Sequence, residues 1–282
     1  MRSLLGTALI DWSKRIAPAR VEEWAEINQV HLVLPHLPPE FHGYRLIQIS
    51  DFHIGTWLSR KELVQAIAMV NRLRPDLVAI TGDFVTDDPQ DYLDDLASSL
   101  RLLSSRDGVY AVLGNHDHWS DPVVVRRALH LGGVIELCNT FRTLQRGPAC
   151  LHIAGIDCSM EGLDRLDKVL ARLPSEGSAV LLAHEPDFAD RSAPSRRFDL
   201  QISGHSHGGQ INFPLIGPLF LPRCARKYPS GFYRVGDMFL YTNRGLGTAK
   251  FQVRFNCPPE ITVFILESPG MAGSPAAQAD SF

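Results

Sequence analysis

Short runs of apolar residues alternate with longer stretches of helical spacing through the first half of the chain. Three apolar runs predict buried strands, at residues 44–50, 77–81 and 109–113. Between the first two, Ser59 and Glu62 form a capping box that begins a helix, and Pro75 ends it. A second helix is predicted over 92–103. Strands that alternate with helices in this way predict βαβ units and a largely parallel sheet.

The second half of the chain carries shorter predicted elements. One helix is expected over 163–173, and the expected strands are 134–137, 140–144, 151–155, 179–183, 200–203, 235–241 and 261–266. The chain shows no internal repeat and no linker that would divide it. We therefore expect an α/β fold in a single domain, built from two sheets or as a sandwich flanked by helices.

Polar side chains follow five of the predicted strands at the point where each strand ends. They are the carboxylates, carboxamide and imidazoles of Asp51, His53, Asp83, Asn115, His116, His184, His205 and His207. Open α/β sheets place their ligand sites just beyond the carboxyl ends of the strands. The sequence therefore predicts that these side chains meet in one site.

His205 and His207 stand one residue apart between glycines. On an extended segment both rings would point to the same side, because side chains alternate along a strand. The flanking Gly204 and Gly208 would let the backbone approach whatever the rings hold. A polar turn is the alternative interpretation of this stretch.

The donor atoms of this group indicate a metal site. Oxygen and imidazole donors suit Mn, Fe, Zn or Ni better than Cu(I). Eight such groups exceed what one ion binds and fit two ions. A carboxylate that bridges two cations positions them to clamp both oxygens of an in-line displacement and to activate water. This arrangement predicts hydrolysis of a phosphoester.

Composition narrows the range of partners and compartments. Charged residues make up 21% of the 282 residues and the formal net charge is -3, with no basic run. No nucleic-acid partner is therefore expected. The five cysteines form no C-x-x-C pair and are odd in number. This argues against a disulfide framework and favours a reducing, cytoplasmic compartment.

The N-terminal segment 1–43 is expected to hold an amphipathic helix and a lead-in strand. Apolar residues from Leu5 to Ile16 recur at helical spacing, but the run is too short to span a bilayer. Such a helix would lie on a membrane, at the inner face of the plasma membrane, or would pack on the domain. The domain itself is expected over 44–268, and residues 269–282 predict a disordered tail.

Five short blocks resemble the motifs of the calcineurin-like metallophosphoesterases. In the family's order they are Asp51-x-His53, Gly82-Asp83, Gly114-Asn115-His116-Asp117, His184 and Gly204-His205-Ser206-His207. The resemblance implies a four-layer αββα sandwich in a single domain. It also implies two divalent metal ions as cofactors, with Mn²⁺ ahead of Fe, Zn and Ni.

The resemblance also implies a role for each residue of the blocks. One metal would be held by Asp51, His53 and His207, the other by Asn115, His184 and His205, with Asp83 as the bridge. His116 would face the scissile phosphate, and Asp117 would fix the orientation and tautomer of His116. Hydrolysis would proceed by direct attack of a metal-bound hydroxide, without a covalent phosphoenzyme.

Two stretches outside these blocks resemble a narrower bacterial branch of the family. They are Leu34-Pro35-x-Leu37-Pro38 and Asn243-Arg244-Gly245-Leu246-Gly247-Thr248. That branch includes membrane-associated phosphodiesterases and enzymes that cleave the pyrophosphate of UDP-2,3-diacylglucosamine in lipid A synthesis. The resemblance is to the branch as a whole, and either activity remains open.

The stretch 211–222 is unusually apolar and contains three prolines, directly after the histidine pair. Such a loop would cover acyl chains or contact a bilayer, and a loop packed over the sandwich edge is the alternative. We expect Arg223 to meet an anionic headgroup or a phosphate of the substrate. Arg244 and His118 are weaker candidates for substrate binding.

Together these features predict a dinuclear phosphodiesterase or pyrophosphatase that acts on a small-molecule or lipid-linked phosphoester such as UDP-2,3-diacylglucosamine. A phosphomonoesterase or cyclic-nucleotide phosphodiesterase is the first alternative. A non-catalytic scaffold on the same fold is the second, and the complete set of ligand residues disfavours it.

Overall fold

The computed structural model describes residues 25–86, 89–249 and 251–271. The predicted N-terminal helix and most of the predicted C-terminal tail lie outside these residues. In the described part of the chain, the helices are all too short or too polar to cross a membrane.

The first of two large sheets has six strands in the spatial order β1, β14, β2, β3, β4, β5. Their bounds are Glu26–Val33, Glu260–Glu267, Tyr44–Ile49, Leu77–Ile80, Val109–Ala111 and Ile135–Glu136. The strands from β2 to β5 are parallel. β14 pairs antiparallel with β2, and β1 extends the sheet parallel to β14.

The second sheet has six strands in the order β12, β13, β9, β8, β7, β6. Their bounds are Gly231–Val235, Met238–Thr242, Leu200–Ser203, Ser178–Leu182, Ala149–Gly155 and Thr140–Arg146. The four central strands are parallel, and β12 and β6 are antiparallel edges. A separate hairpin consists of β10 (Asn212–Phe213) and β11 (Gly217–Pro218).

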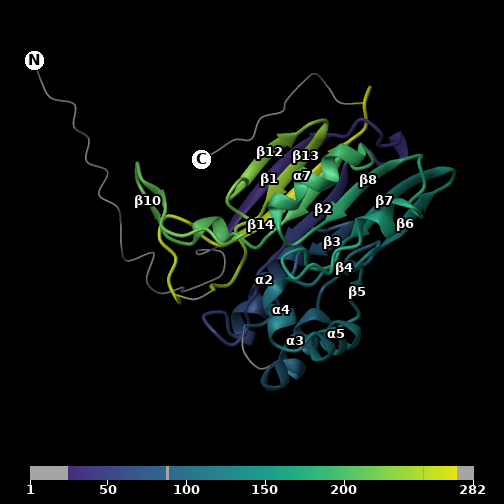
Figure 1. Ribbon diagram of the computed structural model, residues 1–282. Helices are drawn as coiled ribbons and strands as arrows, with labels where there is room; N and C mark the ends of the chain where they lie inside the picture. The colour runs from purple at the N-terminus through teal and green to yellow at the C-terminus, as the bar shows by residue number, and fades with distance from the viewer. Residues whose placement is uncertain (1–24, 87–88, 250, 272–282) are drawn as a thin grey trace, which may run out of the picture.

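Helices cover the outer face of each sheet (Figure 1). The α-helices are α2 (Arg60–Arg72), α3 (Leu93–Leu100), α4 (Asn115–Trp119), α5 (Pro122–Leu131), α6 (Leu166–Leu170) and α7 (Ala189–Ser192). Short 3₁₀ turns are η2 (Pro39–Phe41), η3 (Pro89–Asp91), η4 (Pro186–Phe188), η5 (Ala193–Ser195) and η6 (His207–Gly209). The predicted capping box at Ser59 and Glu62 is present at the start of α2.

Three hydrophobic cores separate four layers. Alternating residues of the first sheet point to opposite sides, so Ile47 packs under α2, α3 and α5 whereas Leu46 faces the second sheet. The second sheet follows the same rule, because Leu182 faces the first sheet and Leu181 packs under α6 and α7. The fold is therefore the expected αββα sandwich.

The predicted strand 235–241 corresponds to β13, but it begins three residues too early, and β12 was missed. The structure contains a hairpin there, because Gly236 adopts a φ of 59° and turns the chain between β12 and β13. The turn residues Gly236 and Asp237 are a typical two-residue hairpin signal that was missed from the sequence. The helices α4 and α5 were also not predicted from the sequence.

Candidate metal centre

Loops at the ends of both sheets are joined by hydrogen bonds that bring the predicted site together. After β2, the Asp51 amide donates to the Gly82 carbonyl after β3 at 2.9 Å. Two bonds cross between the sheets: His184 Nδ1 lies 2.6 Å from the Thr81 carbonyl oxygen, and the His205 amide donates to the Asp51 carboxylate at 3.0 Å. The sandwich thereby holds both sets of strand-end residues at one edge.

The potential ligand atoms form three overlapping groups, in each of which all atoms lie within 4.8 Å of one another. The groups are Asp51, His53 and His207; His53, Asp83 and His116; and Asp83, His184 and His205. The first and third groups correspond to the two predicted ion sites, and Asn115 is buried beside them. The structure therefore brings all seven predicted ligands together.

Asp83 lies between the two outer groups. Its Oδ1 accepts a hydrogen bond from the His116 amide at 2.9 Å. Its Oδ2 is 3.1 Å from His184 Nε2 on one side and 3.5 Å from His53 Nε2 on the other. This oxygen has the position that a bridging carboxylate requires.

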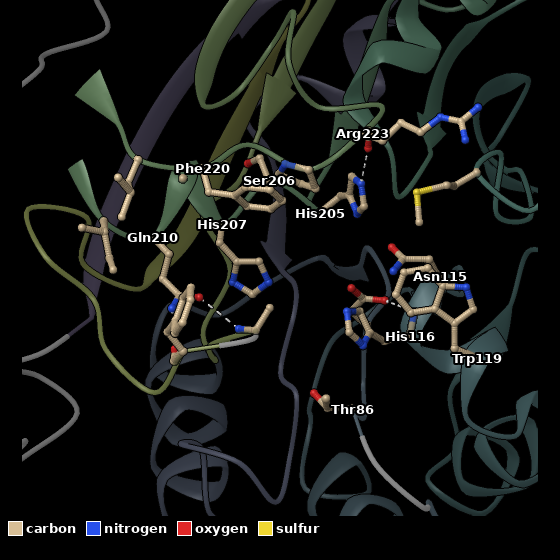
Figure 2. A pocket seen from close by; sticks show the side chains of 18 of the residues that line it. Thr86, Asn115, His116, Trp119, His205, Ser206, His207, Gln210, Phe220 and Arg223 are labelled. Carbon is tan, nitrogen blue, oxygen red and sulfur yellow. Dashed lines mark hydrogen bonds between the residues drawn. The ribbon is translucent and has the colours of Figure 1, made fainter. Parts of the chain in front are cut away.

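Backbone carbonyls fix the protonation of two of the histidine rings. His184 Nδ1 lies 2.6 Å from the Thr81 carbonyl oxygen, and His205 Nε2 lies 2.7 Å from the Arg223 carbonyl oxygen (Figure 2). A carbonyl only accepts, so these nitrogens carry the proton. Each ring then presents the lone pair of its other nitrogen to the site, which is how histidine ligands of metals are held.

Two observations show that the residues fit a pair of cations. Asn115 Oδ1 is buried and has no hydrogen-bond partner among the described residues, although buried polar atoms are almost always paired. In addition, Nε2 of His53 and Nε2 of His207 face each other at 3.1 Å. Two ring nitrogens at that distance repel unless a proton or a cation lies between them.

Burial and neighbouring charges shift the pKa values of the predicted ligands in opposite directions. Burial raises the pKa of the Asp51 carboxyl to about 7, and burial lowers the pKa of His53 to about 3. Burial also opposes ionisation of Asp83, yet His184 holds the pKa of Asp83 well below its usual value. In turn the pKa of His184 is raised against its burial by the Asp83 carboxylate. The low pKa values leave Asp83 ionised and His53 neutral at pH 7, and these are the forms that bind a cation.

The backbone at the site is strained. Positive φ angles occur at five of the seven predicted ligands, namely Asp51 (52°), His53 (46°), Asp83 (55°), His205 (69°) and His207 (50°). Residues other than glycine rarely adopt this region, and such outliers concentrate at functional sites. The prediction that His205 and His207 lie on an extended segment is therefore wrong. They lie in a turn after β9, and each ring joins a different ligand group.

Two glycines allow the carboxylates to approach the backbone. A Cβ on Gly114 would collide with Asp83 Oδ1, and a Cβ on Gly204 would collide with Asp51 Oδ2. Any side chain at these two positions would therefore displace a predicted ligand.

Asp117 has a different role from the one predicted. Its carboxylate accepts hydrogen bonds from the amides of Asp83 (3.0 Å), Phe84 (2.8 Å), Val85 (3.3 Å) and Gly114 (2.9 Å). Within the described chain, its hydrogen bonds do not include one to the His116 ring. The reason is that α4 turns the Asp117 side chain back toward the end of β3. Asp117 therefore positions the loop that carries Asp83 rather than orienting His116.

The His116 ring is part of the site itself. It packs edge-on against the His53 ring at a centroid distance of 4.8 Å, and Trp119 packs on it at the same distance. Trp119 follows His116 by one turn of α4 and was missed from the sequence, although the i, i+3 spacing brings the two together.

A cavity of ≈ 660 Å³ opens over the site. Asp83, Asn115, His116, His205 and His207 line one part of it. Apolar side chains line much of the remainder: Trp119, Met160, Ile211, Leu219, Phe220, Pro222 and Phe251. In the view of Figure 2, Phe220 and Trp119 lie on opposite sides of the histidines.

The three weaker predictions for substrate binding have different outcomes. Arg223 lines the cavity. Arg244 does not, because its guanidinium is held at 2.7 Å by both Glu260 and Glu26. His118 also lies away from the cavity lining, with its ring bonded to Asp157 at 2.7 Å. The structure therefore argues against substrate contacts for Arg244 and His118.

Comparison with known proteins gives an independent assignment of the chain to a family. Residues 44–209 match the family model described as "Calcineurin-like phosphoesterase". The chain is 36% identical to "Uncharacterized metallophosphoesterase YkuE" of Bacillus subtilis over 236 residues, covering 82% of each chain.

Two further relatives carry more informative names. "Phosphodiesterase YaeI" of Escherichia coli is 28% identical, with 79% of this chain and 82% of the relative covered. "Transmembrane protein with metallophosphoesterase domain" of Danio rerio is 32% identical, with 86% of this chain covered. The match spans only 57% of that longer protein.

Proposed function

Because the chain belongs to the calcineurin-like phosphoesterase family and is a metal-dependent phosphoester hydrolase, we propose that it cleaves phosphodiester or pyrophosphate bonds next to an apolar group. The observation that carries this proposal is the cavity, in which the predicted metal ligands face a wall of apolar side chains. The similarity to a protein named as a phosphodiesterase supports the choice of a diester over a monoester.

We assign one ion to Asp51, His53 and His207 and the other to Asn115, His184 and His205. Asp83 would contact both ions, since its Oδ2 lies between His53 and His184. When bound, two divalent ions supply charge neutralisation at the phosphoryl oxygens and activation of water. The oxygen and imidazole donors favour Mn²⁺, and they also suit Fe, Zn and Ni.

The protein's own residues position the substrate and move the proton. His116 lies at the cavity and donates a proton to the leaving oxygen, or stabilises the charge that develops there. Trp119 packs on the His116 ring and limits its rotation. Arg223 at the cavity edge binds a second phosphate or an anionic headgroup. Water attacks directly, and the protein forms no covalent phosphoenzyme.

The apolar wall defines the substrate class. Leu219 and Phe220 line the cavity from the hairpin side, and Phe251 lines it from a second loop. A sugar phosphate or cyclic nucleotide would leave these side chains against water, whereas acyl chains would bury them. We therefore propose a lipid-linked substrate, of which UDP-2,3-diacylglucosamine is the example that the resembling bacterial branch provides.

A comparison of substrates tests this proposal. The full chain, loaded with Mn²⁺, would be assayed on UDP-2,3-diacylglucosamine in detergent micelles, bis(p-nitrophenyl) phosphate, p-nitrophenyl phosphate and cyclic AMP. We expect the highest kcat/KM for the lipid nucleotide and the lowest for the monoester. The Phe220→Ser variant should lose more activity on the lipid nucleotide than on the small diester. A preference for the monoester or for cyclic AMP would refute the proposed substrate class.

A further inference from the structure

Large apolar side chains are exposed beside the mouth of the cavity. We call this surface the apolar platform: Phe213, Leu215, Ile216, Leu219, Phe220, Phe251 and Val253. At the tip of the β10–β11 hairpin, Leu215 and Ile216 have relative exposures of 108% and 83%. Both lie outside the three hydrophobic cores of the described residues. The hairpin extends away from both sheets (Figure 1).

The platform is one surface rather than a set of separate residues. The Asn212 amide donates to the Phe255 carbonyl at 2.9 Å, and the Phe213 and Phe255 rings lie 5.7 Å apart. The Gln210 side chain also donates to the carbonyl of Val253 at 2.8 Å. These contacts fasten the hairpin to residues 251–255, so that both segments present their apolar side chains together.

Cations follow the hairpin in the chain, with the Asp187 carboxylate beside them as acceptor of the Arg226 amide at 3.1 Å. Residues 211–227 contain three cations, Arg223, Arg226 and Lys227, and no carboxylate. Lys227 is paired with Asp190 at 2.7 Å. Arg223 and Arg226 are exposed and form no ion pair with any carboxylate of the described residues. Arg223 lines the cavity together with Leu219 and Phe220 of the platform, and Arg226 follows it three residues later in the chain.

We propose that the apolar platform docks the protein on a bilayer that contains anionic phospholipid. The hairpin tip inserts Leu215 and Ile216 among the acyl chains, and Arg223 and Arg226 contact headgroup phosphates. Contiguous exposed apolar surface with flanking cations is the combination that binds the interface of an anionic membrane. Since Leu219, Phe220 and Phe251 also line the cavity, docking places the cavity mouth at the lipid surface.

Vesicle flotation tests this proposal without any substrate, so the result does not depend on the proposed catalytic function. The full chain would be incubated with phosphatidylcholine vesicles and with vesicles in which roughly a third of the lipid is phosphatidylglycerol. We expect binding to the anionic vesicles and weaker binding when salt screens the cations. The double variant Leu215→Ser/Ile216→Ser should bind at least about tenfold more weakly, because each substitution removes a large apolar side chain that the bilayer would bury.

One matched control and one charge variant complete the design. Val123→Ser removes an apolar side chain of 71% exposure on α5, away from the platform, and should leave vesicle binding unchanged. Arg226→Gln should weaken binding to anionic vesicles only. All variants retain the N-terminal segment, so a difference between them reports the platform alone. A circular dichroism spectrum and a urea unfolding midpoint that match those of the wild type confirm that the double variant is folded.

Three outcomes would overturn the proposal. The first is that the wild-type protein does not float with anionic vesicles. The second is that the folded double variant floats as well as the wild type. The third is a concentration-dependent dimer in gel filtration that the double variant abolishes while vesicle binding is unaffected, because the platform would then serve a second copy of the chain.

Discussion

Asp83 uses its two carboxylate oxygens for different purposes. Oδ1 accepts the His116 amide, which holds the side chain in place, and Oδ2 lies between His53 and His184. The residue combines a left-handed backbone with nearly complete burial, and Gly114 leaves the space that it needs. The site therefore depends on both the shape and the negative charge of the Asp83 side chain.

The substitution Asp83→Asn tests the bridge directly. It preserves the shape of the side chain and removes its charge, so both ions should bind weakly. We expect kcat on a diester to fall by more than about 100-fold, the upper end of the effect of residues that only support a metal site. Metal content per chain, measured by mass spectrometry, should fall in parallel. His118→Gln is the control and should retain its metals, because His118 lies away from the cavity. Full activity in Asp83→Asn would contradict the bridging role.

A different result is expected for His116→Ala. This substitution removes a proton donor but no assigned ligand, so metal content should remain at the wild-type level. The rate on a diester with a poor leaving group should fall by about 10²- to 10⁴-fold. The loss should be smaller for p-nitrophenyl esters, whose leaving oxygen needs less protonation. Loss of metal in this variant would instead make His116 a ligand.

The residue types at the site were predictable from the sequence, but their conformations were not. Polar residues after five strands indicate where the chemistry lies, because parallel strands end at a common edge. The left-handed backbone at His205 and His207 could not be inferred, since local rules assign that region to glycine. The assignment of Asp117 failed for a related reason. Its position beside His116 gave no information on the four amides that it binds.

At the scale of elements, Asp117 connects the end of β3 to the start of α4. Replacing it with Ala leaves four buried amides without an acceptor. We expect the free energy of unfolding to fall by roughly 3 kcal/mol, because unsatisfied buried groups carry their full desolvation cost. Metal affinity should fall as well, since the loop carries Asp83.

The matched control is Asp121→Ala, which removes the N-cap of α5. This substitution should lower the free energy of unfolding by only about 1 kcal/mol and leave metal affinity unchanged. Urea unfolding and metal titration on both variants make the comparison. Equal effects of the two substitutions on metal binding would show that Asp117 does not position the site.

The β10–β11 hairpin shows a second limit of sequence interpretation. Three prolines excluded a central strand, and the structure agrees in placing the segment outside both large sheets. Whether its apolar residues were packed or exposed depended on contacts with residues 251–255, more than thirty positions later. Apolar composition alone is compatible with both arrangements.

At the scale of the whole molecule, Glu260 joins the two sheets behind the site. It lies on β14 of the first sheet and accepts hydrogen bonds from Tyr241 on β13 of the second, and from Arg244 at 2.7 Å. Burial opposes its ionisation, but the charge of Arg244 and the hydrogen bonds from Tyr241, Arg244 and Thr262 together outweigh burial and lower the pKa of Glu260. The carboxylate therefore stabilises the fold above its unfolded pKa, and this contribution is lost as the pH falls through the folded pKa.

Glu260→Gln should accordingly destabilise the protein by roughly 3 kcal/mol at pH 7, because it leaves Arg244 without its most buried partner. The difference in free energy of unfolding between wild type and variant should shrink as the pH is lowered below the ordinary carboxyl range. Urea unfolding at pH 7 and at about pH 3, below the ordinary carboxyl pKa, measures both quantities. A difference that stays constant with pH would contradict the ion pair as the source of the stabilisation.

The architecture was the part of the molecule that the sequence predicted best. Alternating strands and helices specified the βαβ core, and the motif blocks implied the second sheet and its helices. The hairpin at 231–242 was missed because β12 is half exposed and lacks a clear apolar pattern, and because the turn signal at Gly236 and Asp237 was not used. The segment order, the two sheets and the common edge of the site nevertheless follow from the pattern of apolar runs and the polar residues that end them.

The proposed function requires two metal ions at the edge of the sandwich where the strand-end residues meet. The most direct test is a titration of chelator-stripped protein with Mn²⁺, in which bound metal and hydrolysis of bis(p-nitrophenyl) phosphate are measured in the same samples. We predict no turnover without metal and a rise to a plateau at about two ions per chain, as a dinuclear centre requires. Turnover that survives complete removal of metal would contradict the proposed two-metal hydrolysis. The same holds for a protein that is loaded with two ions and inert on phosphodiesters, monoesters and pyrophosphates.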